Sequence, residues 1–290
     1  MKQLLILSGK GGTGKTTVAG AFIKFAAARA YADCDVDAPN LHLVMRQSKA
    51  PVRTDYFGLP KSLIDTEKCI GCDKCRQHCR FDAIKVDEKG RYEVDAFACE
   101  GCGVCEFVCP VSAITMYPAK AGDLMLYTDD AVFSTAQLLM GSGTSGKLVT
   151  EVKNQLKTAA GDAELAIVDG SPGIGCPVIA SLSGVDMVLV VAEPSVSGIS
   201  DMERIIKTAG IFGVKVTVCI NKCDTNLKNS GVIELFCLER NIPFAGRIPF
   251  DPDVVRVTNA GLSIADADCV SGRAAKGVFD RTMELLMAES

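Results

Sequence analysis

Eight of the fourteen cysteines are concentrated between Cys69 and Cys109, and their spacing constrains the fold more than any other feature. Two runs share the pattern Cys-x2-Cys-x2-Cys-x3-Cys, the second begins 30 residues after the first, and each is followed by an Ala-Ile pair. This segment has many cysteines and few apolar runs long enough to form a helix of a large domain. The repeat predicts a small domain with two-fold pseudo-symmetry.

These cysteines are predicted to bind metal rather than to form disulfides. The N-terminal apolar run Met1–Leu7 is too short for a signal peptide or a membrane span. We therefore expect a cytoplasmic protein with no membrane partner, in which thiols stay reduced. A net charge of −4 argues against nucleic acid as a partner, because its phosphates demand clustered Lys and Arg.

The repeated spacing matches bacterial ferredoxins that hold two [4Fe–4S] clusters, in which three thiolates bind one cluster and the fourth binds the other. It assigns Cys69, Cys72, Cys75 and Cys109 to cluster I, and Cys99, Cys102, Cys105 and Cys79 to cluster II. Arg80 departs from the pattern where the second run has Pro110, and its charge is expected to raise the potential of cluster II. Zinc is the alternative metal, but it takes four ligands rather than an interlocked eight. The clusters could also serve only to staple a small domain.

A second motif lies near the N-terminus. Gln3–Leu7 is an apolar run suited to a buried parallel strand, and the Ala-rich Thr17–Arg29 has helical character. Residues 9–16 between them fit GxxxxGK[ST] in the context which that motif requires, although a Gly-rich turn without nucleotide is the alternative. Lys15 would reach the β- and γ-phosphates, and the Thr16 hydroxyl would ligate Mg²⁺. The predicted nucleotide-binding residues here are Gly11, Gly12, Thr13, Gly14, Lys15, Thr16 and Thr17.

Strands and helices alternate again after the cysteine-rich segment. Expected strands are Leu165–Val168, Met187–Ala192 and Val214–Ile220, and expected helices are Gly146–Ala160, Ser197–Phe212 and the terminal Gly272–Ser290. This rhythm predicts an α/β fold with a parallel sheet covered on both faces. The terminal helix is expected to pack on the sheet, because its acidic residues disfavour a membrane surface. We predict one domain from 1–58 and 119–290, and an insert from 59–118.

The run Lys10–Thr17 resembles the deviant Walker A motif of the MinD/Mrp/ParA group, which includes the nitrogenase iron protein. The resemblance implies a SIMIBI-type parallel-sheet P-loop NTPase with a small α+β ferredoxin domain inserted. In that group the early lysine, here Lys10, crosses to the nucleotide of a second subunit. The resemblance therefore implies ATP-dependent pairing, with a second copy or with a paralogue. A second cation at the γ-phosphate would stabilise charge in the transition state.

Two acidic positions also resemble this group. Asp169 ends the strand Leu165–Val168 and leads into a Gly-Ser-Pro-Gly turn, which is a Walker B and switch II arrangement. At that rim of a parallel sheet its carboxylate would hold Mg²⁺ through water. Asp35 resembles the switch I aspartate that positions the attacking water, and Asp33 and Asp37 are nearby alternatives.

The base-binding residues are expected after later strands. Asn221 and Lys222 begin an Asn-Lys-Cys-Asp run that resembles the segment whose Asn contacts adenine, although it also fits the NKxD motif of GTPases. Lys10 favours ATP over GTP. Pro249 and Phe250 resemble the segment that closes over the base. Residues 141–147 also fit GxxxxGK, but no strand precedes them and the hydroxyl is missing, so they are not predicted to bind nucleotide.

The P-loop motif and the ferredoxin repeat are both specific, and they occur in one chain. We therefore predict that nucleotide chemistry and cluster chemistry are coupled. The first hypothesis is an ATPase whose switch and dimer changes gate electron transfer through the clusters to an acceptor protein. The second is a maturation factor that assembles or delivers a metal cluster to a client. A MinD-like positioning ATPase gains no support from the acidic terminal helix. Cys176 matches the offset of a cluster-binding cysteine in the nitrogenase iron protein, with a buried inert thiol as the alternative.

Overall fold

The computed structural model describes residues 1–288, and these residues form two compact units. The P-loop unit comprises Met1–Arg53, Leu124–Gln137 and the chain from Gly146 onward. The cysteine-rich unit comprises Thr54–Asp123 and Leu138–Ser145. The last two residues of the predicted terminal helix, 289 and 290, lie outside the described residues. No helix within residues 1–288 is long and apolar enough to cross a membrane.

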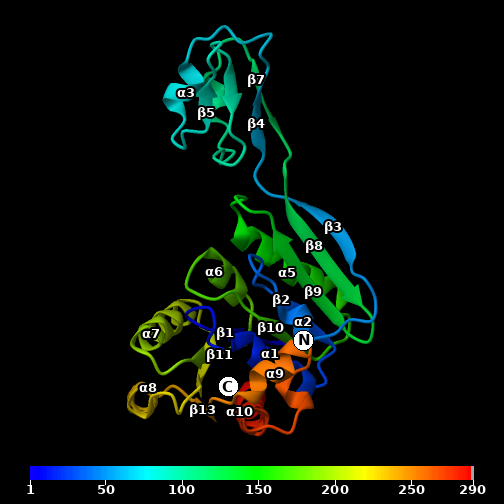
Figure 1. The fold of residues 1–290 in the computed structure, drawn as a ribbon, viewed down its shortest axis with the longest axis vertical. Coiled ribbons are helices and arrows are strands. Elements are labelled where there is room, and N and C mark those ends of the chain that lie inside the picture. Colours follow the sequence, from blue (N-terminus) through cyan, green and yellow to red (C-terminus); the bar gives the residue numbers. More distant parts are fainter. Residues whose placement is uncertain (289–290) are drawn as a thin grey trace. The chain divides into compact units, whose positions relative to one another are not determined.

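A large sheet forms the centre of the P-loop unit (Figure 1). Its strand order is β13-β12-β11-β1-β10-β2-β9-β8-β3, and the neighbours from β13 to β9 are all parallel. This confirms the predicted α/β fold with a parallel sheet. The strands are β1 (Lys2–Leu7), β2 (Ala30–Asp33), β3 (Val52–Phe57), β8 (Lys120–Thr128), β9 (Val132–Leu138), β10 (Leu165–Asp169), β11 (Met187–Ala192), β12 (Lys215–Asn221) and β13 (Phe244–Ile248).

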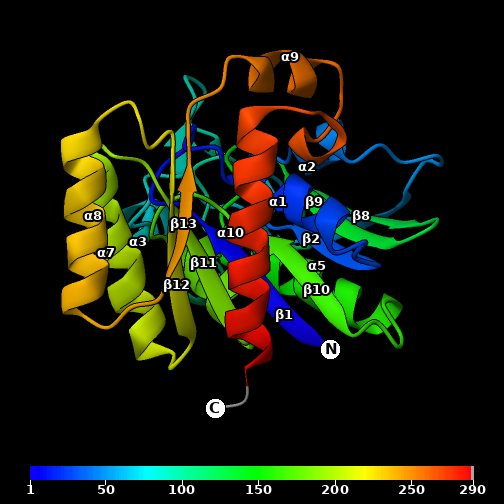
Figure 2. The same cartoon turned by 90° about the horizontal axis from the view of Figure 1, so that it is seen from below.

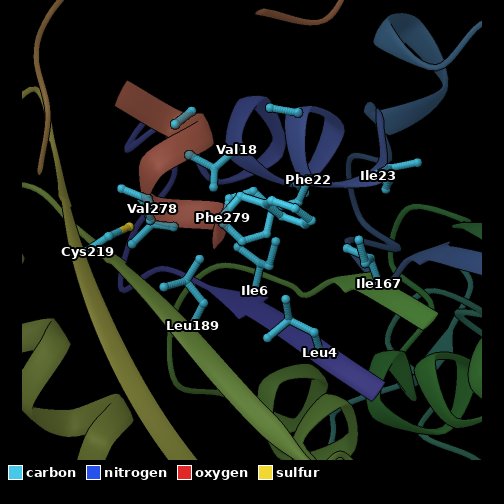
Figure 3. Packing of buried hydrophobic residues seen from close by; sticks show 14 of the residues in the cluster. Leu4, Ile6, Val18, Phe22, Ile23, Ile167, Leu189, Cys219, Val278 and Phe279 are labelled. Carbon is cyan, nitrogen blue, oxygen red and sulfur yellow. The ribbon is translucent and has the colours of Figure 1, made fainter. Parts of the chain in front are cut away.

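Helices cover both faces of this sheet, because its central strands are apolar on both sides. Leu4 and Ile6 of β1 belong to a core cluster that includes residues of α1 and α10, where Phe22 meets Phe279 edge-on with ring centroids 5.2 Å apart (Figure 3). Figure 2 shows α10 lying across the sheet beside α1. Leu5 points to the opposite face, as alternation along a strand requires. The helices are α1 (Lys15–Phe25), α2 (Leu41–Val44), α5 (Ser145–Ala159), α6 (Cys176–Leu182), α7 (Val196–Ile211), α8 (Leu227–Glu239), α9 (Asp253–Asn259), η1 (Ile264–Asp266) and α10 (Val270–Met287).

The cysteine-rich unit repeats one local structure. Two short helices, α3 (Lys74–His78) and α4 (Val104–Val108), occupy equivalent places in the two runs of cysteines. The cysteines that end them, Cys79 and Cys109, have the same backbone angles, φ −75° and ψ 112°. The antiparallel pairs are β4 (Lys61–Ile64) with β7 (Ile114–Tyr117), and β5 (Ile84–Val86) with β6 (Tyr92–Val94). Both Ala-Ile pairs are buried in its small core.

Candidate nucleotide and cluster sites

Two glycines of the loop between β1 and α1 have a backbone conformation that other residues adopt only with strain. Gly12 and Gly14 have φ of +79° and +92°, in the region that favours glycine. A Cβ at Gly14 would also lie 2.2 Å from Nδ2 of Asn221. Asn221 donates that amide to the Thr13 carbonyl at 2.6 Å, and Lys222 donates to the Gly12 carbonyl at 2.9 Å. The base-motif residues therefore support the loop directly.

Three side chains meet at the start of α1 and the end of β10. Nζ of Lys15 lies 2.5 Å from Oδ1 of Asp169, and the Thr16 hydroxyl donates to Oδ2 at 2.7 Å. Lys15 is 6 % exposed and Asp169 is fully buried. Burial lowers the pKa of Lys15, but the charges of Asp169 and Asp33 outweigh it and hold that pKa above its usual value. Lys15 therefore carries a positive charge. A metal cation could take the place of its ammonium beside the Asp169 carboxylate.

Asp33 organises the loop that follows β2. Its carboxylate accepts hydrogen bonds from the backbone N–H of Asp35 at 3.0 Å, and from Asn40 and Leu41 at 2.9 Å each. Burial, and then the negative charge of Asp169, raises the pKa of Asp33 to about 7. Burial also raises the pKa of Asp35, which lies near Lys15 and Asp169 at the same rim. The sequence named Asp33 only as an alternative to Asp35, and the structure gives it this separate role as a loop anchor.

The segment after β13 is attached to the base motif. Asp224 accepts a hydrogen bond from the Phe250 backbone N–H at 2.7 Å, and this bond holds Pro249 and Phe250 beside the end of β12. The Phe250 side chain is half exposed. Within the loop, the Thr13 hydroxyl is buried and has no hydrogen-bond partner among the described residues. A buried orphan hydroxyl beside left-handed glycines fits a loop that receives an anionic ligand.

Lys10 does not join this cluster of charges. Its Nζ lies 3.0 Å from Oε2 of Glu193 and donates to the hydroxyls of Ser195 and Ser197 at 3.3 Å each. These partners follow β11, and sequence reasoning missed all three. Their position just past the carboxyl end of a parallel strand was the available signal, because ligand sites gather at that edge.

The eight cysteines of the repeat separate into two sets of four, each around its own cavity. One cavity is lined by Cys69, Cys72, Cys75 and Cys109, and the other by Cys79, Cys99, Cys102 and Cys105. Within residues 1–288, no three His, Cys, Asp or Glu side chains converge closely enough to hold a single metal ion. Four soft thiols spread around a cavity fit a polynuclear iron–sulfur group better than one zinc ion.

The two sets differ in electrostatics. The Ser62 hydroxyl lies 3.6 Å from Sγ of Cys99, and Lys61 donates to the Cys99 carbonyl. Burial opposes ionisation of Cys99, but hydrogen bonds from Ser62 and the charge of Lys61 bring its pKa below the usual value. Burial instead raises the pKa of the thiols of Cys75 and Cys105. A lowered pKa favours the thiolate form of Cys99, which is the form that binds metal.

The remaining cysteines divide by exposure. Cys34, Cys219, Cys223, Cys237 and Cys269 are buried, as expected for core or loop thiols. Cys176 is exposed at the first residue of α6, so the alternative of a buried inert thiol is wrong.

Comparisons with known proteins agree with both parts of the chain. Residues 62–116 match the family of 4Fe-4S dicluster domains. The uncharacterized protein MJ0578 of Methanocaldococcus jannaschii is 32 % identical, over 98 % of this chain and 97 % of its own. Pyruvate synthase subunit PorD of the same organism is 42 % identical over 55 residues, which are 19 % of this chain and 64 % of its own. The septum site-determining protein MinD of Pyrococcus horikoshii, solved with Mg-ADP, shares the fold with a TM-score of 0.61 and 16 % identity, over 99 % of this chain and 97 % of that one.

Proposed function

This chain belongs to the same family as the protein MJ0578 and combines the fold of MinD-type P-loop ATPases with a 4Fe-4S dicluster domain, and we propose that it uses ATP binding and hydrolysis to gate electron transfer through two [4Fe–4S] clusters. The observation that carries the proposal is the presence, in one chain, of two complete four-thiol cavities and a buried Lys15–Asp169 pair. The clusters, when bound, supply one-electron carriers. The similarity of the cysteine-rich segment to a subunit of pyruvate synthase supports transfer to a redox partner protein.

We propose that ATP binding separates the Lys15–Asp169 ion pair and gives each side chain a new partner. On ATP binding Lys15 turns from the carboxylate to the β- and γ-phosphates. Asp169 and Thr16, hydrogen-bonded to each other at 2.7 Å, would hold Mg²⁺, which would neutralise phosphate charge there. Asp35 orients the attacking water. Because Asp169 also opens the segment that leads to α6, the exchange links ligand charge to backbone movement.

We propose ATP rather than GTP as the nucleotide. Oδ1 of Asp224 accepts from the Phe250 backbone N–H at 2.7 Å, which gives this carboxylate a role in holding residues 249–250 rather than in reading guanine. Asn221 donates Nδ2 to the Thr13 carbonyl, so its Oδ1 is the atom proposed to accept from the base, with Pro249 and Phe250 beside it. This arrangement favours adenine.

We propose that ATP binding pairs this chain with a second copy or with a paralogue, as the resemblance of Lys10–Thr17 to the deviant Walker A motif implies. Lys10 would then leave Glu193 and cross to the partner's nucleotide. Releasing one ion pair at a half-exposed position costs little compared with a charge-assisted contact to a γ-phosphate.

A second candidate function is the assembly or delivery of an iron–sulfur or other metal cluster. The exposed Cys176 favours it, because an accessible thiol directly after the switch segment could hold a transferable cluster. Under this alternative the ferredoxin clusters supply electrons or docking.

An anaerobic redox titration followed by EPR tests the proposed gating. The protein with both clusters is titrated without nucleotide, with MgADP and with MgATP, beside Lys15→Ala as the control. We expect MgATP to shift a cluster potential, and the shift to vanish in Lys15→Ala because its phosphate contact is lost. Unchanged potentials with both clusters intact would reject gating and direct attention to cluster delivery.

A further inference from the structure

The segment Leu138–Ser145, here called the linking loop, belongs to the cysteine-rich unit although it follows a strand of the main sheet. Its last residue, Ser145, is also the first residue of α5, and Gly146 belongs to the P-loop unit. The chain therefore passes from one unit to the other across a single peptide bond. Any displacement of the start of α5 acts directly on the linking loop.

Within the cysteine-rich unit the linking loop rests on the neighbours of Cys99. A Cβ at Gly141 would lie 3.0 Å from the Phe97 ring, and one at Gly143 would lie 3.3 Å from Oε2 of Glu100. The loop is fixed at its far end by Thr144, whose hydroxyl lies 3.1 Å from that of Tyr56. Glu100 and Gly143 are both exposed, so the Glu100 carboxylate lies against the backbone of the linking loop at the surface, where a shift of that backbone changes the space open to the carboxylate.

The Cys99–Cys102 loop is also held by the chain that enters β4. Gly101 has φ +67°, and a Cβ there would lie 2.2 Å from the Pro60 carbonyl oxygen. Lys61 donates to the Cys99 carbonyl. The residues around this contact, Lys61, Glu100, Gly143 and Thr144 among them, line one small cavity. The linking loop and the binding loop of the second thiol set thus form one packed group.

The internal repeat supplies a control for this contact. The equivalent loop of the first set is Cys69–Cys72, in which Ile70 replaces Glu100 and is 64 % exposed. A Cβ at Gly71 would have one neighbour within 4 Å, the Tyr92 ring at 3.9 Å. Two loops of identical spacing therefore differ in what they touch, and Cys99–Cys102 is the one packed on the linking loop.

In the P-loop unit the start of α5 contacts the segment that follows Asp169. A Cβ at Gly146 would lie 3.1 Å from the Cys176 carbonyl oxygen and 3.2 Å from its Cβ. The segment between Asp169 and Cys176 is tied to the nucleotide loop, since Gly173 donates to the Ser8 carbonyl at 3.0 Å. There is no room for a methyl group between Gly146 and Cys176, so movement of this segment toward α5 would press on Gly146.

We propose that the linking loop transmits the nucleotide state from the Asp169–Cys176 segment to the Cys99–Cys102 loop, so that nucleotide tunes only the second set of four thiols. Glu100 is the positioning residue, because moving its carboxylate relative to those thiolates changes the local charge and hence the potential of a bound cluster. This inference rests on the proposed function and adds which of the two sets responds.

Hydrogen–deuterium exchange on the anaerobic holoprotein tests the path without reference to activity. We expect MgATP to change exchange by at least about twofold in peptides covering the linking loop and Cys99–Cys102, and to leave the Cys69–Cys72 peptide unchanged. Equal changes in both binding loops, or none in Cys99–Cys102, would overturn the proposal. The Cys69–Cys72 peptide is the matched control in every sample.

A charge placed on the linking loop tests the role of Glu100. Gly143→Asp sets a second carboxylate against Oε2 of Glu100, whereas Gly143→Asn has the same shape without the charge. We expect Gly143→Asp to abolish the MgATP-induced potential shift while both clusters and ATP hydrolysis remain, and Gly143→Asn to retain the shift. Glu100→Gln alone should also abolish the shift, because the carboxylate whose movement changes the local charge is then absent.

The outcomes distinguish a failure of the proposed gating from a failure of the linking-loop path. If MgATP shifts neither potential in the unmodified protein, the proposed gating fails and the linking-loop path fails with it. If the shift persists in Gly143→Asp, or belongs to the cluster of Cys69, gating stands and only the linking-loop path is rejected.

Discussion

Burial of charge at the carboxyl rim of the sheet is the main feature at the residue scale. Lys15, Asp169 and Asp33 are all buried, and the single ammonium faces two carboxylates. Burial, and then the negative charge of Asp169, raises the pKa of Asp33, so this site holds a proton on Asp33 more tightly than water would. It is also ready for Mg²⁺, which would supply the missing positive charge.

The raised pKa of Asp33 predicts a pH dependence of stability. Because its pKa is about 7 in the folded chain and 3.8 ordinarily, the folded state binds the proton more tightly. The associated stability is fully present below the ordinary pKa and is lost as pH rises to the folded value. In nucleotide-free protein we expect Asp33→Asn to reduce the fall in free energy of unfolding between about pH 5 and 7, by on the order of 1 kcal/mol per pH unit.

Denaturant unfolding at several pH values measures this slope. Asp37→Asn is the control, because Asp37 is exposed in the same loop. An unaltered slope in Asp33→Asn would contradict the assignment of the proton to Asp33.

At the scale of elements, the strand–loop–helix unit from β1 to α1 was predictable. The GxxxxGK[ST] motif requires a strand before it and a helix after it, and the apolar pattern on either side predicts the same two elements. The positions of Asp169 and Asn221 followed from strand ends in a parallel sheet. The partners of Lys10 were not predictable, because Ser195 and Ser197 look like ordinary helix-start residues, and Ser195 does cap α7. Only the folded sheet brings the ends of β1 and β11 together.

The glycines of the nucleotide loop provide a matched pair for mutation. Gly14→Ala places a Cβ 2.2 Å from Asn221 at φ +92°, whereas Gly11→Ala meets nothing within 4 Å. We expect Gly14→Ala to lower the free energy of unfolding by about 1–3 kcal/mol, through backbone strain and displacement of Asn221. Gly11→Ala should stay within about 0.5 kcal/mol of the parent. Chemical denaturation of nucleotide-free protein measures both, and equal losses would refute the account.

At the scale of the whole molecule, repeat spacing alone predicted which cysteines share a cavity. Local spacing could do this because thiols three residues apart must lie together, and the x3 step carries the fourth thiol to the other half. The packing of the linking loop on Phe97 and Glu100 could not be foreseen, because the loop lies about 40 positions after these two residues in the sequence. Such long-range contacts depend on the complete fold.

Paired cysteine replacements test the crossed arrangement. Cys79→Ser with Cys99→Ser damages one set, so about half of the iron should remain. Cys79→Ser with Cys69→Ser damages both sets and should remove nearly all of it. Iron analysis and EPR of purified protein give the result, with ATP binding as the check that the P-loop unit is folded. The reverse order of iron contents would show that each run binds its own cluster.

The strand order also bears on how the cysteine-rich unit is accommodated. The chain leaves the main sheet through β3 and returns through β8, and these two strands are neighbours at one end of the order. The intervening residues therefore form a side branch whose two ends are already adjacent. Closing such a branch costs the sheet little configurational entropy, because loop-closure entropy grows only with the logarithm of the number of residues enclosed. A short turn from β3 to β8 would leave every strand pairing in the remainder of the sheet unbroken.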